Sequence, residues 1–189
     1  MIIEFLADGF EMIEALTPVD LLRRVGANVV TVSLNESGFS RSTHNVLVKA
    51  DASISELSSL RPEEAEMIIL PGGMPGADNL FACGKVTDLL MKAEKNGTRL
   101  AAICAAPSVL GRLGLLDGRK ATCYPGFEAK LIGADVIKAD NGGHVVTDGN
   151  ITTASGMGVS LQFAKELVSV LYGPARAEKM YSTLMAENR

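Results

Sequence analysis

Cys104 is the side chain of this sequence best placed for covalent chemistry. It follows the apolar run 100–103, which predicts a short buried strand, and it precedes a helix that has Pro107 in its first turn. The amino end of a helix stabilises negative charge, and cysteines in such places can have a pKa lowered from about 8.5 to roughly 3.5–7.5. Cysteine is also among the most buried residue types. The stretch alone therefore predicts either a reactive thiolate or a packing thiol.

Two other features could assist a reactive thiol. Glu14 lies in the apolar run 12–16, so its carboxyl either faces solvent, which the periodicity favours, or is held in a site with a raised pKa. Gly72 and Gly73 follow the apolar run 67–70. They either make a tight turn, which is the simpler interpretation, or present backbone N–H groups to an oxyanion.

The remaining reactive side chains favour neither a metal nor a cofactor. His44 and His144 lie in polar stretches without helical metal-ligand spacing, and we interpret them as surface residues. Cys83 and Cys123 are interpreted as packing or partly exposed thiols. The chain has neither a GxxxxGK[ST] loop nor a GxGxxG sequence that opens a helix, so no nucleotide site is predicted.

The elements that must position these residues alternate between short apolar strands and helices. This alternation predicts an α/β fold with a mostly parallel sheet covered on both faces, and a small antiparallel hairpin around the Asp148-Gly149-Asn150 turn. Ligands of such sheets bind beyond the carboxyl ends of the strands, where Gly72 and Cys104 are predicted to lie. The predicted strands are 2–6, 28–34, 46–49, 67–70, 100–103, 120–123, 136–139, 144–147 and 151–153, and the predicted helices are 11–16, 19–25, 86–95, 107–113, 127–131, 158–171 and 174–184.

Length and composition indicate one globular domain. The chain has 189 residues, 47% of them hydrophobic and 21% charged. The net charge of −4 gives no reason to expect nucleic acid, and the apolar runs are too short to cross a membrane. The acidic N-terminal stretch does not resemble a signal peptide, and the odd number of widely spaced cysteines argues against a disulfide framework. We therefore expect a cytoplasmic protein with reduced thiols.

Taken in order, the motifs resemble the ThiJ/PfpI superfamily, and most closely its parkinsonism-associated deglycase branch. They run nearly from end to end of the chain: 6–14, 18–24, 70–73 with Gly76-Ala77, and 101–107, with weaker matches at 51–53 and 155–158. The resemblance implies a flavodoxin-like three-layer sandwich, formed as a single class I glutamine amidotransferase-like domain over residues 1–189. It also implies a homodimer that needs no cofactor and no metal.

The resemblance also assigns roles to individual residues. It implies that Cys104 is the nucleophile on a strained elbow and that Glu14 is the carboxylic acid beside it. Gly73 and Ala105 would donate the N–H groups of an oxyanion hole, with Gly72 and Tyr124 as further substrate-binding residues. A protonated Glu14 that donates to the sulfur would lower the pKa of Cys104 and have its own pKa raised.

Three positions depart from the pattern of the relatives. Ala105 stands where the protease-like branch has a histidine, so no base follows the thiol. Tyr124 stands where many close relatives have a histidine, and tyrosine is a poor base at neutral pH. Ser155 and His44 stand where relatives have arginines, which weakens an anion site built on those arginines.

The function that the resemblance implies is a cofactor-independent glyoxalase and deglycase. Its substrates would be small α-oxoaldehydes, such as methylglyoxal or glyoxal, or their early glycation adducts. The alternative is a redox-responsive stress protein or chaperone that senses oxidation at Cys104. A cysteine peptidase of the PfpI type is a third and weaker alternative, because of Ala105.

Overall fold

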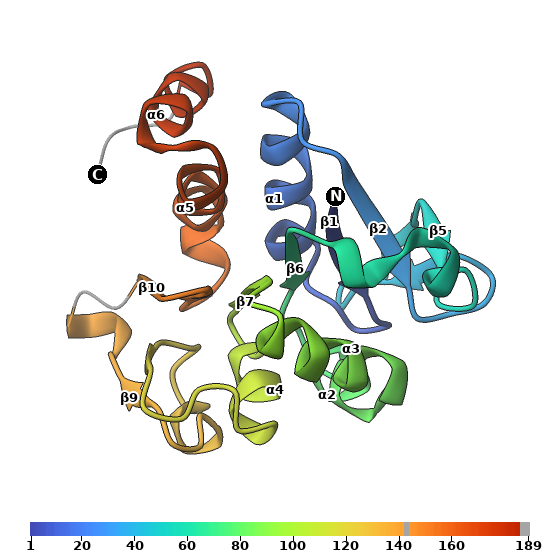
Figure 1. Cartoon of the computed structure of the whole chain (residues 1–189), viewed down its shortest axis with the longest axis horizontal. Helices are drawn as coiled ribbons and strands as arrows, with labels where there is room; N and C mark the ends of the chain where they lie inside the picture. The colour runs from blue at the N-terminus through green and yellow to red at the C-terminus, as the bar shows by residue number, and fades with distance from the viewer. Residues whose placement is uncertain (142–143, 186–189) are drawn as a thin grey trace.

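The structure, a computed structural model, describes residues 1–141 and 144–185 (Figure 1). Its main sheet has seven strands in the spatial order β10-β11-β7-β6-β1-β2-β5, and all neighbours are parallel except the antiparallel pair β10 and β11. These strands are β1 (Ile2–Leu6), β2 (Val29–Ser33), β5 (Ala52–Ser53), β6 (Met67–Leu70), β7 (Arg99–Ile103), β10 (Val145–Asp148) and β11 (Ile151–Ala154). Two small sheets pair β3 (Phe39–Arg41) with β4 (Leu47–Lys49), and β8 (Lys120–Ala121) with β9 (Asp135–Val136).

Helices cover both faces of the main sheet. The helices are α1 (Met12–Arg24), α2 (Gly76–Ala82), α3 (Gly84–Lys95), α4 (Pro107–Arg112), α5 (Ser160–Tyr172) and α6 (Pro174–Ser182). Short 3-10 turns are η1 (Leu57–Leu60), η2 (Pro62–Glu64), η3 (Glu128–Lys130), η4 (Ala139–Asn141) and η5 (Met157–Val159). No helix of the described residues is long and apolar enough to cross a membrane.

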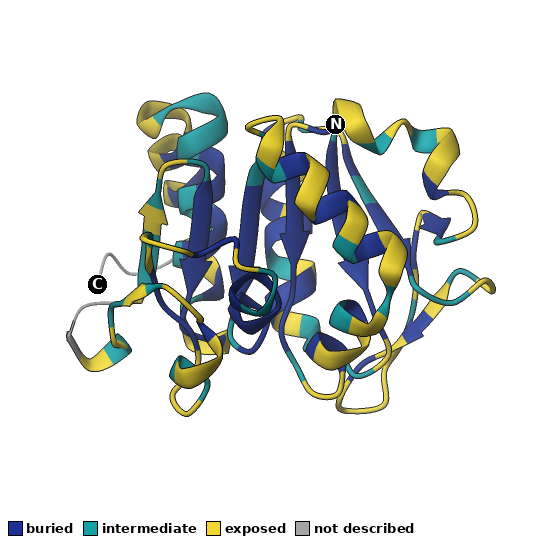
Figure 2. Ribbon diagram, turned by 60° about the horizontal axis from the view of Figure 1, so that its bottom comes forward, coloured by how far each residue is buried: buried dark blue, intermediate teal, exposed yellow. Residues whose placement is uncertain are grey.

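Two hydrophobic cores separate the three layers. One core joins the sheet to α1, α5 and α6, and the other joins it to α2, α3 and α4 (Figure 1). Neighbouring residues of a strand enter opposite cores, as Ile2 and Ile3 do in β1. Figure 2 shows the consequence, since the central strands are buried while the outer faces of the helices are exposed. The predicted flavodoxin-like sandwich and its antiparallel hairpin are confirmed.

The sheet order places the catalytic candidates at one edge. From β1 the chain moves to β2 and β5 on one side, and then returns to β6 and β7 on the other. The strand order therefore reverses between β1 and β6, and in open α/β sheets such a reversal opens a crevice at the carboxyl ends of the strands. Glu14 follows β1, Gly72 and Gly73 follow β6, and Cys104 follows β7.

The prediction of two helical pieces around Pro18 is wrong. One continuous helix, α1, runs through Pro18. It begins at Met12, after Glu11, whose side chain caps the helix by accepting the backbone N–H of Glu14 at 2.8 Å. Pro18 has no N–H and removes one hydrogen bond inside the helix. The buried face of the helix, which includes Ala15, Val19 and Leu22, holds the two halves together against the sheet.

Some other predicted boundaries differ from the structure. The stretch 35–43, where no helix or strand is predicted, contains β3, whose partner β4 lies beyond a turn. Helix α2 was not predicted, because Pro75-Gly76 resembles a turn, whereas here Pro75 caps the helix and Gly76 opens it. Strands β8 and β9 have only two residues each, so the predicted strands 120–123 and 136–139 are too long.

Candidate active site

The backbone of Cys104 has a conformation that is rare for a residue with a side chain. Its φ is 65°, in the left-handed region that favours glycine. Two hydrogen bonds hold it there: its N–H donates to the carbonyl of Ala154 at 2.8 Å, and its carbonyl accepts from the N–H of Tyr124 at 2.9 Å. The half-buried thiol is thereby presented at the sharp turn between β7 and α4.

The carboxyl of Glu14 meets Cys104 across Gly72. Glu14 is only 1% exposed, so the solvent-facing orientation that periodicity favours is wrong. Its Oε2 accepts the N–H of Gly72 at 3.0 Å. A methyl group added to Gly72 would lie 2.5 Å from that Oε2 and 2.7 Å from the Cβ of Cys104, so only glycine fits between the two side chains.

Two backbone N–H groups act on the sulfur. The N–H groups of Gly73 and Ala105 hydrogen-bond to Cys104 and favour its charged form. Gly73 has a φ of 88°, in the left-handed region that favours glycine. The N–H of Gly72 is instead donated to Glu14, so Gly72 orients the acid. The N–H groups of Gly73 and Ala105 therefore lie beside the sulfur.

The pKa of Glu14 is raised as the sequence predicts, whereas the pKa of Cys104 is not lowered. Burial raises the pKa of Glu14 from 4.5 to about 7, with a further upward contribution from the charge of Glu11. Burial, followed by the charge of Glu14, raises the pKa of Cys104 from 9.0 to about 12, and the two N–H groups only partly oppose this. The predicted lowering of the cysteine pKa is therefore wrong. The surroundings therefore favour the protonated form of both groups, and Glu14 is the more acidic of the two.

One oxygen of the Glu14 carboxyl is available to accept the thiol proton of Cys104. Its Oε1 is buried and has no hydrogen bond of standard geometry to any group in the described part of the chain. Hydrogen bonding to Cys104 nevertheless lowers the pKa of Glu14, which places the two groups close together. An ionised Glu14 in this position can accept the thiol proton.

Tyr124 lies at the rim of the site. Its side chain is 51% exposed, and its ring carbon is 3.2 Å from the position that a methyl group on Gly156 would occupy. The residue after Gly156, Met157, acts through its backbone to lower the pKa of Glu14. Sequence reasoning missed Met157 and Glu11, although the spacing of three residues between Glu11 and Glu14 is that of a helix cap and first turn.

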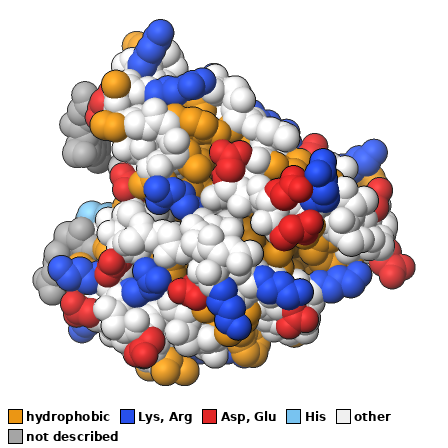
Figure 3. All heavy atoms as spheres, viewed as in Figure 1, with side chains coloured by type: hydrophobic (Ala, Val, Ile, Leu, Met, Phe, Trp, Pro, Cys, Tyr) orange, Lys and Arg blue, Asp and Glu red, His pale blue; other side chains and the backbone are white. Residues whose placement is uncertain are grey.

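Other candidate residues lie outside this site. His44 and His144 are exposed. Within residues 1–141 and 144–185, no group of three or more His, Cys, Asp or Glu side chains could hold a metal ion. Cys123 borders a separate cavity of about 210 Å³. A groove of about 760 Å³ lies between the end of α1 and α6, where Figure 3 shows hydrophobic and basic side chains together.

Comparison with known proteins identifies the family. The sequence profile of the DJ-1/PfpI family matches residues 2–170. The chain belongs to the DJ-1/PfpI family. It is 30% identical to a protein named deglycase from Pyrococcus abyssi, over 87% of this chain and 95% of that protein. The structure of oxidised DJ-1 from Toxoplasma gondii has 35% identity, a TM-score of 0.87, and 97% coverage of both chains.

Some family members are longer than this chain. Protein DJ-1 homolog A of Arabidopsis thaliana is 34% identical over 95% of this chain, but that match spans only 45% of the Arabidopsis protein. The chain thus spans about half the length of that relative. Family membership and fold follow from these comparisons, and some members of the family carry the name deglycase.

Proposed function

We propose that this protein is a cofactor-independent glyoxalase and deglycase for small α-oxoaldehydes and their early glycation adducts. The observation that carries the proposal is the meeting of Glu14 and Cys104 across Gly72. The N–H groups of Gly73 and Ala105 beside the sulfur add the second requirement of carbonyl chemistry, a place for an oxyanion. The deglycase name of the Pyrococcus relative supports the same assignment.

The first step is attack of Cys104 on the aldehyde carbon. Ionised Glu14 accepts the thiol proton as the S–C bond forms, and the carbonyl oxygen becomes an oxyanion held by the N–H groups of Gly73 and Ala105. Glu14 then returns this proton to the oxyanion, which gives a hemithioacetal and restores the carboxylate of Glu14. The proton that leaves sulfur is thus taken up within the site, so a thiol with a raised pKa can serve as the nucleophile.

The second step moves a proton between adjacent carbons. Glu14 takes the proton from the former aldehyde carbon, which gives an enediol, and returns it to the neighbouring carbon. The hydroxyl proton of the hemithioacetal passes to the former ketone oxygen, so the product is the thioester of a 2-hydroxy acid. Water then hydrolyses the thioester and restores the thiol. The sum is the addition of one water to methylglyoxal to give lactate, so one carbon is oxidised while its neighbour is reduced.

The deciding experiment is lactate formation from methylglyoxal without added thiol. We expect turnover by the wild type and a loss of at least about 100-fold in Cys104→Ser and in Glu14→Gln. Cys123→Ser is the matched control, because it removes a buried thiol outside the site, and it should keep most of the activity. Absence of lactate from the wild type would refute the proposal.

The pH dependence provides a second test. Because Glu14 must be ionised to accept the thiol proton, kcat/KM should rise with pH through about 7, the pKa of Glu14. A rate that falls over this range would contradict its role as base.

Two alternative functions have their own tests. A redox sensor without turnover would show oxidation-dependent suppression of client aggregation. A peptidase would digest labelled casein.

We also propose that the protein is a homodimer, with reduced thiols as in the cytoplasm. Ile13 and Leu16 of α1 are exposed, as are Val46 and Leu47 at the β4 hairpin. Met12 and Val48 pack in one cluster, so the two apolar surfaces are neighbours. Light scattering at micromolar concentration should give twice the mass of 19.9 kDa. A monomer under these conditions would contradict the dimer.

A further inference from the structure

Two carboxylates lie at the first turn of α1, one inside the site and one at its wall. Glu11 donates its backbone N–H to the carbonyl of Gly72 at 2.9 Å, and its side chain accepts the N–H of Glu14 at 2.8 Å. A methyl group on Gly73 would lie 2.5 Å from the Glu11 nitrogen. Glu11 is therefore packed directly against the glycine turn formed by Gly72 and Gly73. The N–H of Gly72 donates to Glu14, and the N–H of Gly73 hydrogen-bonds to Cys104.

Within the described part of the chain, no positive charge compensates this pair. Among the described residues, neither Glu11 nor Glu14 forms an ion pair with a basic side chain. Arg112 is paired with Asp78, and Arg41 bonds to Asn45. Glu11 therefore contributes an unopposed negative charge beside the nucleophile.

Three exposed side chains next to Cys104 and Glu14 are uncharged: Met74, Tyr124 and Met157. Met74 follows the glycine turn, the N–H of Tyr124 donates to the carbonyl of Cys104, and the backbone of Met157 acts to lower the pKa of Glu14. All three side chains are exposed, between 40% and 51%. Ser155, before the Gly156 turn, is buried and uncharged. A carboxylate or phosphate on the substrate would lose its hydration here and find no cation in exchange.

We infer that this site selects electrophiles that are neutral or cationic and rejects those that carry an anionic group, with Glu11 as the specificity-determining residue. The field of Glu11 and ionised Glu14 repels an approaching anion. A neutral aldehyde avoids this repulsion. Adducts in which a positive charge remains near the carbonyl would gain from the same field.

The first test needs no turnover. Iodoacetamide and iodoacetate have nearly the same size and differ by one negative charge, and mass spectrometry of the Cys104 peptide reports alkylation by each. The rate ratio of iodoacetamide to iodoacetate should exceed that of N-acetylcysteine by about tenfold, and Glu11→Gln should reduce the excess to about threefold. Glu63→Gln, which changes net charge equally at an exposed position, should leave the ratio unchanged. A wild-type ratio equal to that of N-acetylcysteine, or no effect of Glu11→Gln, would overturn the inference.

The second test rests on the proposed function. Phenylglyoxal should be turned over with a kcat/KM about tenfold above that of 4-carboxyphenylglyoxal, and Glu11→Gln should narrow this gap. The same variant should shift the pH–rate profile to lower pH, because the charge of Glu11 raises the pKa of Glu14. Equal turnover of both substrates would overturn the specificity. If neither substrate is turned over but the alkylation ratios are as expected, the proposed function is refuted. The inference that Glu11 repels anionic electrophiles would then still hold.

Discussion

Gly72 lies between the side chains of Glu14 and Cys104, and its backbone N–H fixes the carboxyl of Glu14. Its φ is not in the left-handed region, so its conformation alone would allow another residue. The requirement for glycine comes from close approach, because the α-carbon faces an acid oxygen, a Cβ and the carbonyl of Ile103.

The first prediction concerns this contact. In Gly72→Ala the new methyl group would lie 2.5 to 2.8 Å from three atoms, two of which belong to the Glu14 carboxyl and the Ile103 backbone. We expect a loss of about 1–3 kcal/mol in the free energy of unfolding and a large loss of activity, because the acid must move. Gly84→Ala is the control, since nothing lies within 4 Å of its added methyl. Full activity in Gly72→Ala would contradict the geometry.

The second prediction concerns the proton of Glu14. Because its pKa is raised from 4.5 to about 7, folding favours its protonated form, and this stability is present below pH 4.5 and is lost as the pH rises through 7. Urea denaturation of wild type and Glu14→Gln should therefore diverge between pH 5 and 8, with a slope of at most about 1.4 kcal/mol per pH unit. At higher pH the glutamine variant should have the larger free energy of unfolding relative to the wild type. Parallel stability curves would show that Glu14 is not buried as described.

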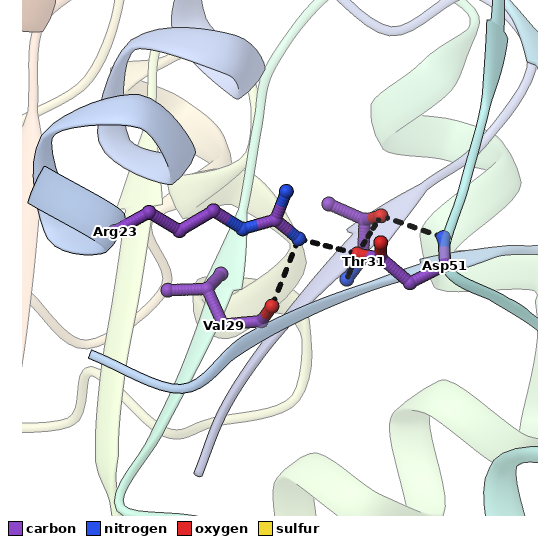
Figure 4. Close-up of polar contacts among 4 residues, drawn as sticks. All are labelled: Arg23, Val29, Thr31 and Asp51. Carbon is purple, nitrogen blue, oxygen red and sulfur yellow. Dashed lines mark hydrogen bonds and ion pairs between the residues drawn. The ribbon is translucent and has the colours of Figure 1, made fainter. Parts of the chain in front are cut away.

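At the scale of elements, polar contacts hold α1 in place at both of its ends. Its first turn carries Glu14, and its last turn carries Arg23, whose Nη2 donates to the carbonyl of Val29 and to Asp51 (Figure 4). The same Asp51 oxygen accepts from the N–H and the hydroxyl of Thr31, and the N–H of Asp51 donates back to that hydroxyl. The network joins α1, β2 and the start of β5 at the opposite end of the helix from the site.

The third prediction tests this network. Burial acts to raise the pKa of Asp51, but the hydrogen bonds from Thr31 and the charge of Arg23 outweigh it and lower the pKa below 3.8. Asp51→Asn should reduce the free energy of unfolding by about 1 kcal/mol at pH 7, because a charged acceptor of several bonds is lost from a half-exposed site. Asp20→Asn, which breaks an exposed pair with Arg24, should cost at most about 0.5 kcal/mol. Equal effects of the two variants would contradict the network.

At the scale of the whole molecule, β1 contains a carboxyl in the hydrophobic core. Glu4 is 0% exposed, and neither of its side-chain oxygens has a hydrogen-bond partner among the described residues. Its cross-strand neighbours are Thr31 and Ile69. Burial raises its pKa well above 4.5, although the charge of Arg23 acts in the opposite direction. The interior therefore holds Glu4 in its protonated form.

The fourth prediction is the pH of greatest stability. The pKa values of Glu4 and Glu14 are raised, so the stability that they contribute is lost as the pH rises above 4.5. The pKa values of Asp51 and Glu56 are lowered, so the stability that they contribute is lost as the pH falls below 3.8 for Asp51 and below 4.5 for Glu56. The melting temperature should therefore be highest near about pH 5.

Two variants test the source of this optimum. Glu4→Gln should flatten the decline in melting temperature between pH 5 and 9, whereas Glu36→Gln, at an exposed position, should leave it unchanged. A wild-type optimum above pH 7 would contradict the assignment.

The order of strands and helices could be read from the sequence because each depends on local patterns. Apolar runs mark β1, β6 and β7, and Pro107 marks the beginning of α4. The resemblance of the motifs was sufficient to identify the family, which the match over residues 2–170 confirms. The assignment of Cys104 and Glu14 to one site also came from the ordered motifs, since the residues are far apart in the chain.

Only the tertiary structure decided the state of that site. Periodicity along α1 is compatible with an exposed Glu14, and burial followed from the Gly72 turn that approaches from another strand. A helix start beside Cys104 suggested a lowered pKa, but desolvation and the charge of Glu14 are contributed by neighbours in space and raise it. Local sequence determines which elements form, whereas solvation and charge around a side chain depend on every segment that packs against it.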